Sequence, residues 1–149
     1  MNKVAIIGCG YIGGFADDSG NRNQIYSHAK AISKLDNFEI VACCDSDTLQ
    51  LEKFSNRWKI KKTYLNLANM LEKENIDILV VSTPTKFHVE NIKLAIKYSI
   101  KAIFCEKPIS FSSVSSNEII ELCKKEKKRK QKLKEDNEYD FGEFEILSD

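Results

Sequence analysis

The chain has 149 residues, of which 23 are lysine or arginine and 22 are aspartate or glutamate, for a formal net charge of +1. This length is that of one ordinary domain with one hydrophobic core. A charge so close to zero gives no global field to attract nucleic acid or an anionic membrane, so neither is expected as a partner. No run of about 20 apolar residues occurs, and the first apolar run, Val4 to Ile7, is too short for a signal peptide.

The cysteine pattern predicts reduced, buried thiols rather than disulfides or a zinc site. The number of cysteines is odd, and no two of them form a C-x-x-C pair. No metal is therefore expected, and reduced thiols favour a cytoplasmic location. The cysteines are Cys9, Cys43, Cys44, Cys105 and Cys123.

Four short apolar runs predict strands of a parallel sheet. The runs are continuous rather than alternating, which is typical of strands buried on both faces. They cover residues 4–7, 40–44, 78–81 and 102–105, and a weaker strand is predicted at Lys62 to Tyr64.

Polar segments with helical spacing of their apolar residues separate these runs. The alternation of strand and helix predicts an α/β fold of the Rossmann type, a single domain with a doubly wound parallel sheet. A last helix is predicted near residues 114–125. The apolar helix positions are, in chain order, Ala29, Ile32 and Leu35; Leu51, Phe54 and Trp58; Leu67, Met70 and Leu71; Val89, Ile92, Ala95 and Ile96; and Ile119, Ile120 and Leu122.

Two segments depart from this alternation. Phe15 to Gln24 is rich in Asp, Asn and Gly, which predicts a surface loop. Residues 124–134 contain eight lysines or arginines, and residues 135–149 contain seven acids and no base. We therefore expect the domain to span residues 1–123, followed by a charged extension, residues 124–149, that is partly helical or disordered. A basic docking segment for a partner is the alternative.

The sequence G-C-G-Y-I-G directly follows the first predicted strand and matches the pattern G-x-G-x-x-G. Gly8 permits a tight turn, Gly10 lets the backbone approach a pyrophosphate, and Gly13 allows close packing of helix on strand. Free N–H groups at the start of the following helix would bind the phosphates. In this position the motif predicts a dinucleotide site, with Tyr11 and Ile12 beside the cofactor.

Asp45 ends the second predicted strand, where a Rossmann domain places the acid that binds the adenosine ribose. It lies 32 residues after Gly13, more than the usual spacing of about 20. The predicted loop at Phe15 to Gln24 accounts for the excess. Because a carboxylate repels a 2′-phosphate, NAD is favoured over NADP. The alternative is that Asp45 caps the next helix, although Asp47 is the better cap candidate.

Ser82, Thr83, Pro84 and Thr85 follow the fourth predicted strand, at residues 78–81, and His88 lies three residues later. Pro84 fixes its own φ and biases Thr83 toward an extended backbone, so the chain should leave the sheet abruptly. Ligands of open α/β folds bind at this carboxyl edge. Taken in isolation, His88 is more often an N-terminal helix residue than a catalytic one.

These motifs resemble those of a known oxidoreductase family, Gfo/Idh/MocA, which includes glucose-fructose oxidoreductase and inositol 2-dehydrogenase. The resemblance covers about residues 3–125 through four ordered motifs. They are the G-x-G-x-x-G, the V-A-x-x-D that ends at Asp45, the T-P-T-x-x-H that ends at His88, and an E-K-P formed by Glu106, Lys107 and Pro108.

The resemblance implies NAD-dependent hydride transfer to or from a hydroxyl-bearing carbon of a sugar, cyclitol or polyol. It makes Lys107 the catalytic residue, which would hydrogen-bond the substrate hydroxyl and help its proton leave, while Glu106 would orient Lys107. His88 would lie near the diphosphate or the substrate mouth. The cofactor-binding residues would be Gly8, Gly10, Tyr11, Ile12, Gly13, Asp45, Ser82, Thr83, Pro84, Thr85, His88, Glu106 and Lys107.

Members of that family carry a second α/β domain with an open antiparallel sheet, which holds the substrate. The 26 residues from 124 to 149, most of them charged, cannot form such a domain, so we expect a truncated chain that is inactive unless a second domain completes it. The alternative is a non-enzymatic module that binds or senses NAD. The sequence leaves open the substrate and whether the chain forms homo- or hetero-oligomers.

Overall fold

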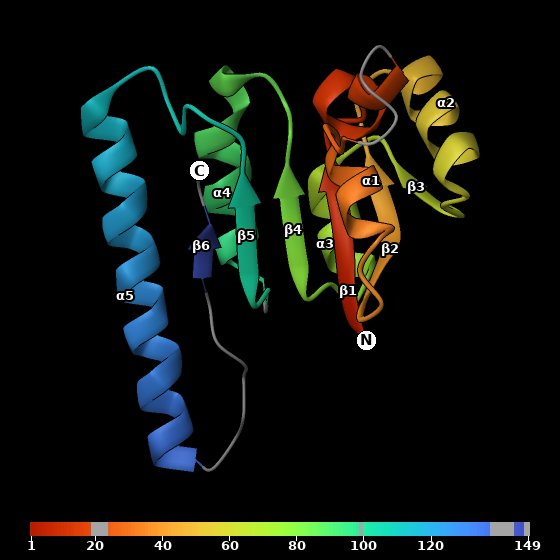
Figure 1. Cartoon of the computed structure of the whole chain (residues 1–149). Helices are drawn as coiled ribbons and strands as arrows, with labels where there is room; N and C mark the ends of the chain where they lie inside the picture. The colour runs from red at the N-terminus through yellow and green to blue at the C-terminus, as the bar shows by residue number, and fades with distance from the viewer. Residues whose placement is uncertain (19–23, 99, 138–144, 148–149) are drawn as a thin grey trace.

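The computed structural model describes residues 1–18, 24–98, 100–137 and 145–147 of the chain. Within them, six parallel strands form one sheet in the order β3-β2-β1-β4-β5-β6 (Figure 1). The predicted Rossmann-type fold is confirmed, together with the five predicted strands. The strands are β1 (Asn2–Ile7), β2 (Phe38–Cys44), β3 (Lys62–Tyr64), β4 (Ile78–Val81), β5 (Ala102–Cys105) and β6 (Glu145–Leu147).

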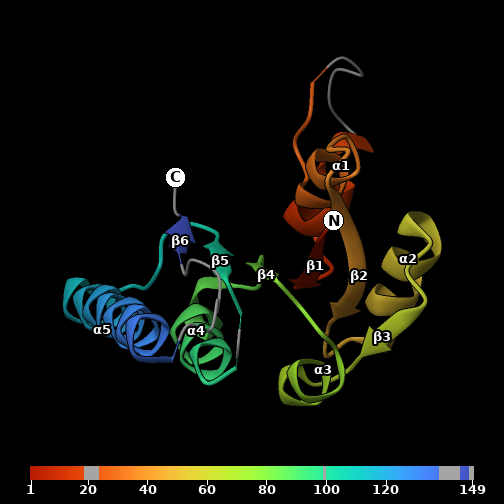
Figure 2. The same ribbon diagram turned by 90° about the horizontal axis from the view of Figure 1, so that it is seen from below.

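Helices cover both faces of the sheet, with α1 and α2 on one side and α3, α4 and α5 on the other (Figure 2). The helix α1 ends three residues before Leu35, a predicted helix position that is 50% exposed. The helices are α1 (His28–Ile32), α2 (Thr48–Trp58), α3 (Leu67–Lys73), α4 (His88–Ile96) and α5 (Ser113–Asn137).

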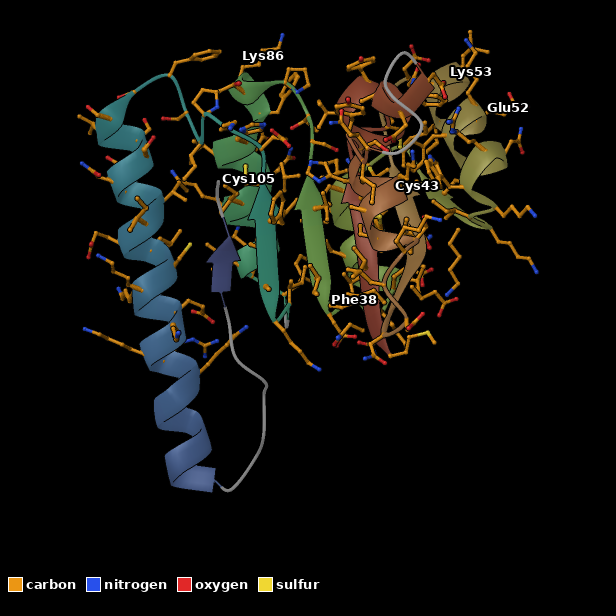
Figure 3. The ribbon with its side chains drawn as sticks, viewed as in Figure 1. Phe38, Cys43, Glu52, Lys53, Lys86 and Cys105 are labelled. Atoms are coloured by element: carbon orange, nitrogen blue, oxygen red, sulfur yellow. The ribbon has the colours of Figure 1, made fainter. Side chains whose placement is uncertain are left out.

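Successive residues of the central strands contribute to two separate cores. In β1, Ala5 and Ile7 pack toward α3, α4 and α5, whereas Val4 and Ile6 pack toward α1 and α2. This double burial explains why the strands are continuous apolar runs. All five cysteines are buried and free, as predicted. Figure 3 shows Cys43 and Cys105 within the sheet, and Glu52 and Lys53 on the outer side of α2.

The segment after the glycine motif is more ordered than the predicted surface loop. Residues 11–15 form a π-helical turn and residues 16–18 a 3-10 turn. Phe15 packs edge-on against Phe54 of α2, with ring centroids 6.1 Å apart. Asp18 accepts two hydrogen bonds from Arg57, of 2.9 and 2.5 Å. These contacts with α2 hold the segment in place; most of the remaining predicted loop lies outside the described residues.

The predicted boundary between residues 123 and 124 falls inside the continuous helix α5, so the start of the predicted extension is helical. The strand β6 lies beyond that boundary and pairs in parallel with β5. The predicted extension therefore contributes a helix and a strand to the domain itself. Of the acidic end expected to be disordered, residues 135–149, residues 135–137 lie in α5 and residues 145–147 form β6. The rest of that end lies outside the described residues. Among the described residues, no helix is long and apolar enough to cross a membrane.

Several charges in the basic run of α5 have partners within the domain. Lys130 is buried, and its Nζ donates a 3.0 Å hydrogen bond to the carbonyl oxygen of Ile100. Burial lowers the pKa of Lys130 below its usual value. On the exposed side, Arg129 pairs with Glu126 one turn earlier, at 2.6 Å. Spacings of three residues place such charges side by side on a helix, a feature that charge counting along the sequence does not reveal.

Replacing Phe54 by alanine tests the core beneath the glycine motif. Phe54 is fully buried and contacts Phe15. Phe54→Ala should lower the free energy of unfolding by about 3–5 kcal/mol, through lost burial and a cavity. Denaturant unfolding measures this, with the exposed neighbour Lys53→Ala as a control that should change little. A loss below about 1 kcal/mol for Phe54→Ala would contradict this packing.

Candidate cofactor-binding site

The candidate site lies at the carboxyl edge of the sheet, where β1 has β2 on one side and β4 on the other. The connections that leave β1 and β4 diverge here, which makes this the usual ligand crevice of an open α/β sheet. A cavity of about 290 Å³ opens at this edge. Its lining comprises Ile7, Gly8, Cys44, Asp45, Ser46, Leu65, Asn66, Leu67, Ala68, Thr83, Pro84, Phe87, Glu90, Asn91 and Leu94.

Two glycines of the motif are required by contacts within the protein. Gly8 has a φ of +93°, and a Cβ there would lie 2.5 Å from the backbone of Ser82. A Cβ on Gly13 would lie 2.3 Å from the carbonyl oxygen of Gly8. Any side chain at these positions would push apart the first turn and the end of β4. Gly8 and Gly13 therefore serve the close packing expected of them.

Gly10 differs from both, because nothing in the described structure requires it to be glycine. A Cβ built on Gly10 meets no atom within 4 Å. Its N–H donates to no acceptor among the described residues. Tyr11 and Ile12, which follow it, are 61% and 38% exposed. An open backbone surface with an available donor is what a pyrophosphate needs, so the motif fits a dinucleotide at Gly10.

The two kinds of glycine should respond differently to substitution. Gly10→Val should leave the free energy of unfolding within about 1 kcal/mol of the original, because its side chain points into open space. It should weaken NADH binding by at least about 100-fold, because that side chain blocks approach to the backbone. Gly13→Ala should instead destabilise the fold by about 2 kcal/mol or more.

Denaturant unfolding and NADH fluorescence titration measure the two effects. A folded Gly10→Val variant with unchanged NADH affinity would disprove the assignment of the turn.

Asp45 joins the glycine turn to the end of β2. One carboxylate oxygen accepts a hydrogen bond from the N–H of Cys9 (2.8 Å), and the other accepts from the N–H of Asp47 (2.9 Å). Gln50 of α2 donates to the carbonyl oxygen of Cys9 at 2.7 Å. Each carboxylate oxygen keeps a second lone pair, and Asp45 lines the cavity. The side chain is thus held in place and can still accept hydrogen bonds from ribose hydroxyls.

Asp47 takes the capping role that was the alternative for Asp45. Its carboxylate accepts from the N–H groups of Leu49 and Gln50, at 2.9 and 3.1 Å, at the start of α2. The Cys9 N–H is already bound to Asp45, so it is not among the free donors expected of the glycine motif. The short turn at residues 11–15 also replaces the regular helix that the motif predicts.

We predict that NADH binds at least about tenfold more tightly than NADPH, because Asp45 repels a 2′-phosphate. Asp45→Asn should reduce this preference by removing the charge while keeping a hydrogen-bond acceptor. Fluorescence titration of both cofactors gives the ratio of the two Kd values. A general loosening of the turn would change both Kd values alike, so it would leave their ratio unchanged. Equal Kd values for the original chain would refute the prediction.

In the turn after β4, one residue supports the glycine turn and others line the cavity. The Ser82 hydroxyl lies 3.1 Å from the carbonyl oxygen of Ile7 and 2.8 Å from that of Gly8, so it braces the glycine turn. Thr83 and Pro84 line the cavity. Thr85 begins a 3-10 turn and does not line the cavity. Only part of this predicted binding segment therefore faces the cavity directly.

His88 is part of the protein interior rather than of an open binding surface. It is 1% exposed. Its Nδ1 lies 2.9 Å from the carbonyl oxygen of Pro108, and its Nε2 lies 2.7 Å from that of Thr83. Both ring nitrogens are occupied, which corrects the expectation that His88 faces the diphosphate or the substrate mouth. Its position instead connects the turns after β4 and β5.

The E-K-P turn after β5 places Lys107 at the same edge of the sheet. Lys107 is exposed and forms no ion pair within the described parts of the chain. Glu106 does not orient Lys107 through its side chain, contrary to expectation. Its carboxylate lies 2.7 Å from Nε2 of His28, the first residue of α1.

The cysteines that line or adjoin this edge are not available as nucleophiles. Burial, with the Asp45 charge, raises the pKa of Cys44 to about 12. Burial, with the Glu106 charge, raises the pKa of Cys105 to about 12. A hydrogen bond with Cys43 and burial raise the pKa of Cys9 well above its usual range. These thiols stay protonated at neutral pH and act as small apolar groups.

Several residues of the site were not identified from the sequence. His28 and Gln50 reach the site from helices, and no motif marks them. His28 could have been noticed because the chain has two histidines. Leu65 and Phe87, which are 55% and 43% exposed, line the cavity from the turns after β3 and β4. The sequence could have indicated these two residues, because both follow predicted strands and the turns after parallel strands meet at one edge of the sheet.

The fold, the glycine turn and the carboxylate of Asp45 define a dinucleotide-binding domain. Residues 2–133 match the Gfo/Idh/MocA oxidoreductase family, whose description is an NAD-binding Rossmann fold. The chain belongs to this family, as the sequence motifs predicted.

Individual relatives agree with this assignment. D-apiose dehydrogenase of Paraburkholderia graminis is 29% identical over 83% of this chain and 29% of that protein. Myo-inositol 2-dehydrogenase of Thermotoga maritima is 26% identical over 83% of this chain and 33% of that protein. The crystal structure of a Lactobacillus plantarum myo-inositol 2-dehydrogenase matches with a TM-score of 0.71 at 26% identity, over 98% of this chain and 36% of that one. The chain spans about a third of the length of these curated relatives.

Proposed function

We propose that this chain is the cofactor-binding part of an NAD-dependent dehydrogenase acting on a hydroxyl-bearing carbon of a sugar, cyclitol or polyol. The observation that carries the cofactor assignment is the open backbone at Gly10 beside a cavity lined by Asp45. The substrate class is supported by the relatives, which are named as dehydrogenases of apiose and inositol. Five free, buried cysteines support a cytoplasmic location.

The described residues divide the work of cofactor binding among three parts of the site. Gly10 and its neighbours would hold the diphosphate, and Asp45 would accept hydrogen bonds from the adenosine ribose. Leu65 and Phe87 add exposed apolar surface to the cavity, which suits the adenine ring. Thr83, in the turn after β4, lines the same cavity.

Lys107 is the residue we assign to proton transfer. NAD, when bound, supplies the acceptor for the hydride. Lys107 would hydrogen-bond the reacting hydroxyl and help its proton leave, which is general acid–base chemistry. Its ammonium is exposed at the carboxyl edge of the sheet, so nothing in the described structure blocks a substrate from reaching it.

A non-enzymatic role in binding or sensing NAD is the second candidate. The observation in its favour is that Lys107 stands on an open edge and does not line the cavity at this site. Hydride transfer requires the substrate carbon to be held against the nicotinamide, and such positioning supplies much of the rate enhancement. We therefore propose that the 149-residue chain binds NAD(H) and has no appreciable turnover unless another domain or chain, or a second copy, covers this edge.

Lys107→Met separates the two candidates. Its NADH affinity should remain within about twofold of the original, because Lys107 contributes to chemistry rather than to cofactor binding. Any dehydrogenase activity of a completed assembly should fall by at least about 100-fold. The assays are NADH titration, and NAD reduction with a panel of sugars, cyclitols and polyols.

Exposed Lys86→Met is the matched control, since it replaces another lysine at the same edge of the sheet (Figure 3). Full activity of the Lys107→Met assembly would remove Lys107 from the mechanism. Robust turnover by the original chain without a partner would refute the proposed need for a cover.

A further inference from the structure

Lys107 is flanked on both sides by contacts to the two histidines of the chain. On one side, Glu106 meets Nε2 of His28 at 2.7 Å. On the other, the carbonyl oxygen of Pro108 lies 2.9 Å from Nδ1 of buried His88. The lysine itself is exposed and unconstrained, so the turn that carries it is held entirely through its neighbours.

The contact between His28 and Glu106 is built into the packing. The ring of His28 packs edge-on against Phe104, with centroids 5.2 Å apart and an interplanar angle of 67°. The side chains of His28 and Glu106 are only 17% and 28% exposed. A carboxylate can only accept hydrogen bonds, so the proton of this contact is on Nε2 of His28. Partial burial strengthens such a charge-assisted hydrogen bond compared with one in open water.

The position of His28 is in turn fixed from the glycine motif. Ser27 caps α1 by accepting from the N–H of Lys30, and its hydroxyl donates to Asp17. Asp17 also accepts a 2.7 Å hydrogen bond from the N–H of Tyr26 and pairs with Lys30 at 3.5 Å. Although burial opposes its ionisation, these hydrogen bonds and the Lys30 charge hold the pKa of Asp17 below its ordinary value.

Asp17 lies in the short 3-10 turn at residues 16–18, a few residues beyond the glycine motif. Hydrogen bonds therefore link Asp17 to Ser27 and His28 to Glu106, next to Lys107, and Ser27 and His28 are neighbours in the chain. Residues 14–16 join Asp17 to the glycine motif along the chain. Each contact is short, and the carboxylates at both ends are largely shielded from water. A packed network of this kind can transmit order from one turn to another.

We infer that His28 is a positioning residue for Lys107. By holding the Glu106 carboxylate, it fixes the E-K-P turn, and it couples that turn to occupation of the glycine motif by the cofactor diphosphate. This inference rests on the proposed function, because it assumes that NAD(H) binds at the glycine motif and that Lys107 is the catalytic group.

Hydrogen–deuterium exchange on the full 149-residue chain, with and without NADH, tests this coupling. In the original chain, NADH should protect both the glycine motif, residues 7–14, and the E-K-P turn, residues 104–110. In His28→Phe, which keeps a ring against Phe104 but has no Nε2, residues 104–110 should exchange about fivefold faster, as expected for the loss of one hydrogen bond. In this variant NADH should still protect residues 7–14, but it should protect residues 104–110 less than it does in the original chain.

Two further variants separate positioning from general stability. His28→Gln places an amide donor where Nε2 lay, so it should restore slow exchange at residues 104–110. Lys34→Ala, an exposed change just beyond α1, should behave as the original chain. A purely structural role would make His28→Phe and His28→Gln equally fast.

The possible failures are distinguishable. Absence of NADH protection anywhere in the original chain would refute the proposed function and, with it, the basis of this inference. Protection of residues 7–14 together with unchanged exchange of residues 104–110 in His28→Phe would overturn the inference and leave the proposed function intact.

Discussion

The close approach of three backbone segments at the carboxyl edge is the constraint on which the rest of the structure depends. Gly8, Gly13 and Ser82 leave no room for a side chain between the end of β1, the following turn and the end of β4. Here the Ser82 hydroxyl binds the carbonyl oxygens that end β1. With these segments in contact, Asp45 can reach the glycine turn. The cavity beside Gly8 exists because these elements meet there.

The division of roles among the glycines separates folding from function within one motif. Gly8 and Gly13 are needed for packing within the protein. No contact of the described residues requires glycine at position 10, so we assign Gly10 to the approach of a ligand, the cofactor diphosphate. The two histidines show a comparable division. His88 is an interior connector between two turns, whereas His28 lies near the surface and contacts the residue next to Lys107.

Much of the fold was accessible from the sequence, because burial on both faces leaves a direct record in apolar runs such as residues 78–81. Asp45 was equally accessible, because strand order places it at the edge. Contacts between segments far apart in the chain were not accessible from the sequence. The meeting of His28 with Glu106, 78 residues later, has no local signal. The strand β6 follows a charged run and shows no apolar pattern, and the hydrogen bond from Lys130 in that run to the carbonyl oxygen of Ile100 also has no local signal.

The packing of Gly14 gives the molecule an optical reporter. Trp58, the single tryptophan, lies so close that a Cβ on Gly14 would be 2.4 Å from its indole nitrogen. That nitrogen is buried and has no hydrogen-bond partner in the described part of the chain. The residue as a whole is half-buried, and the guanidinium of Arg57 lies 5.5 Å from the centre of its ring. Because Gly14 directly follows the dinucleotide motif, a shift of that turn would change the environment of the indole. The chain thus carries its own fluorophore against the turn that follows the dinucleotide motif, and needs no added label.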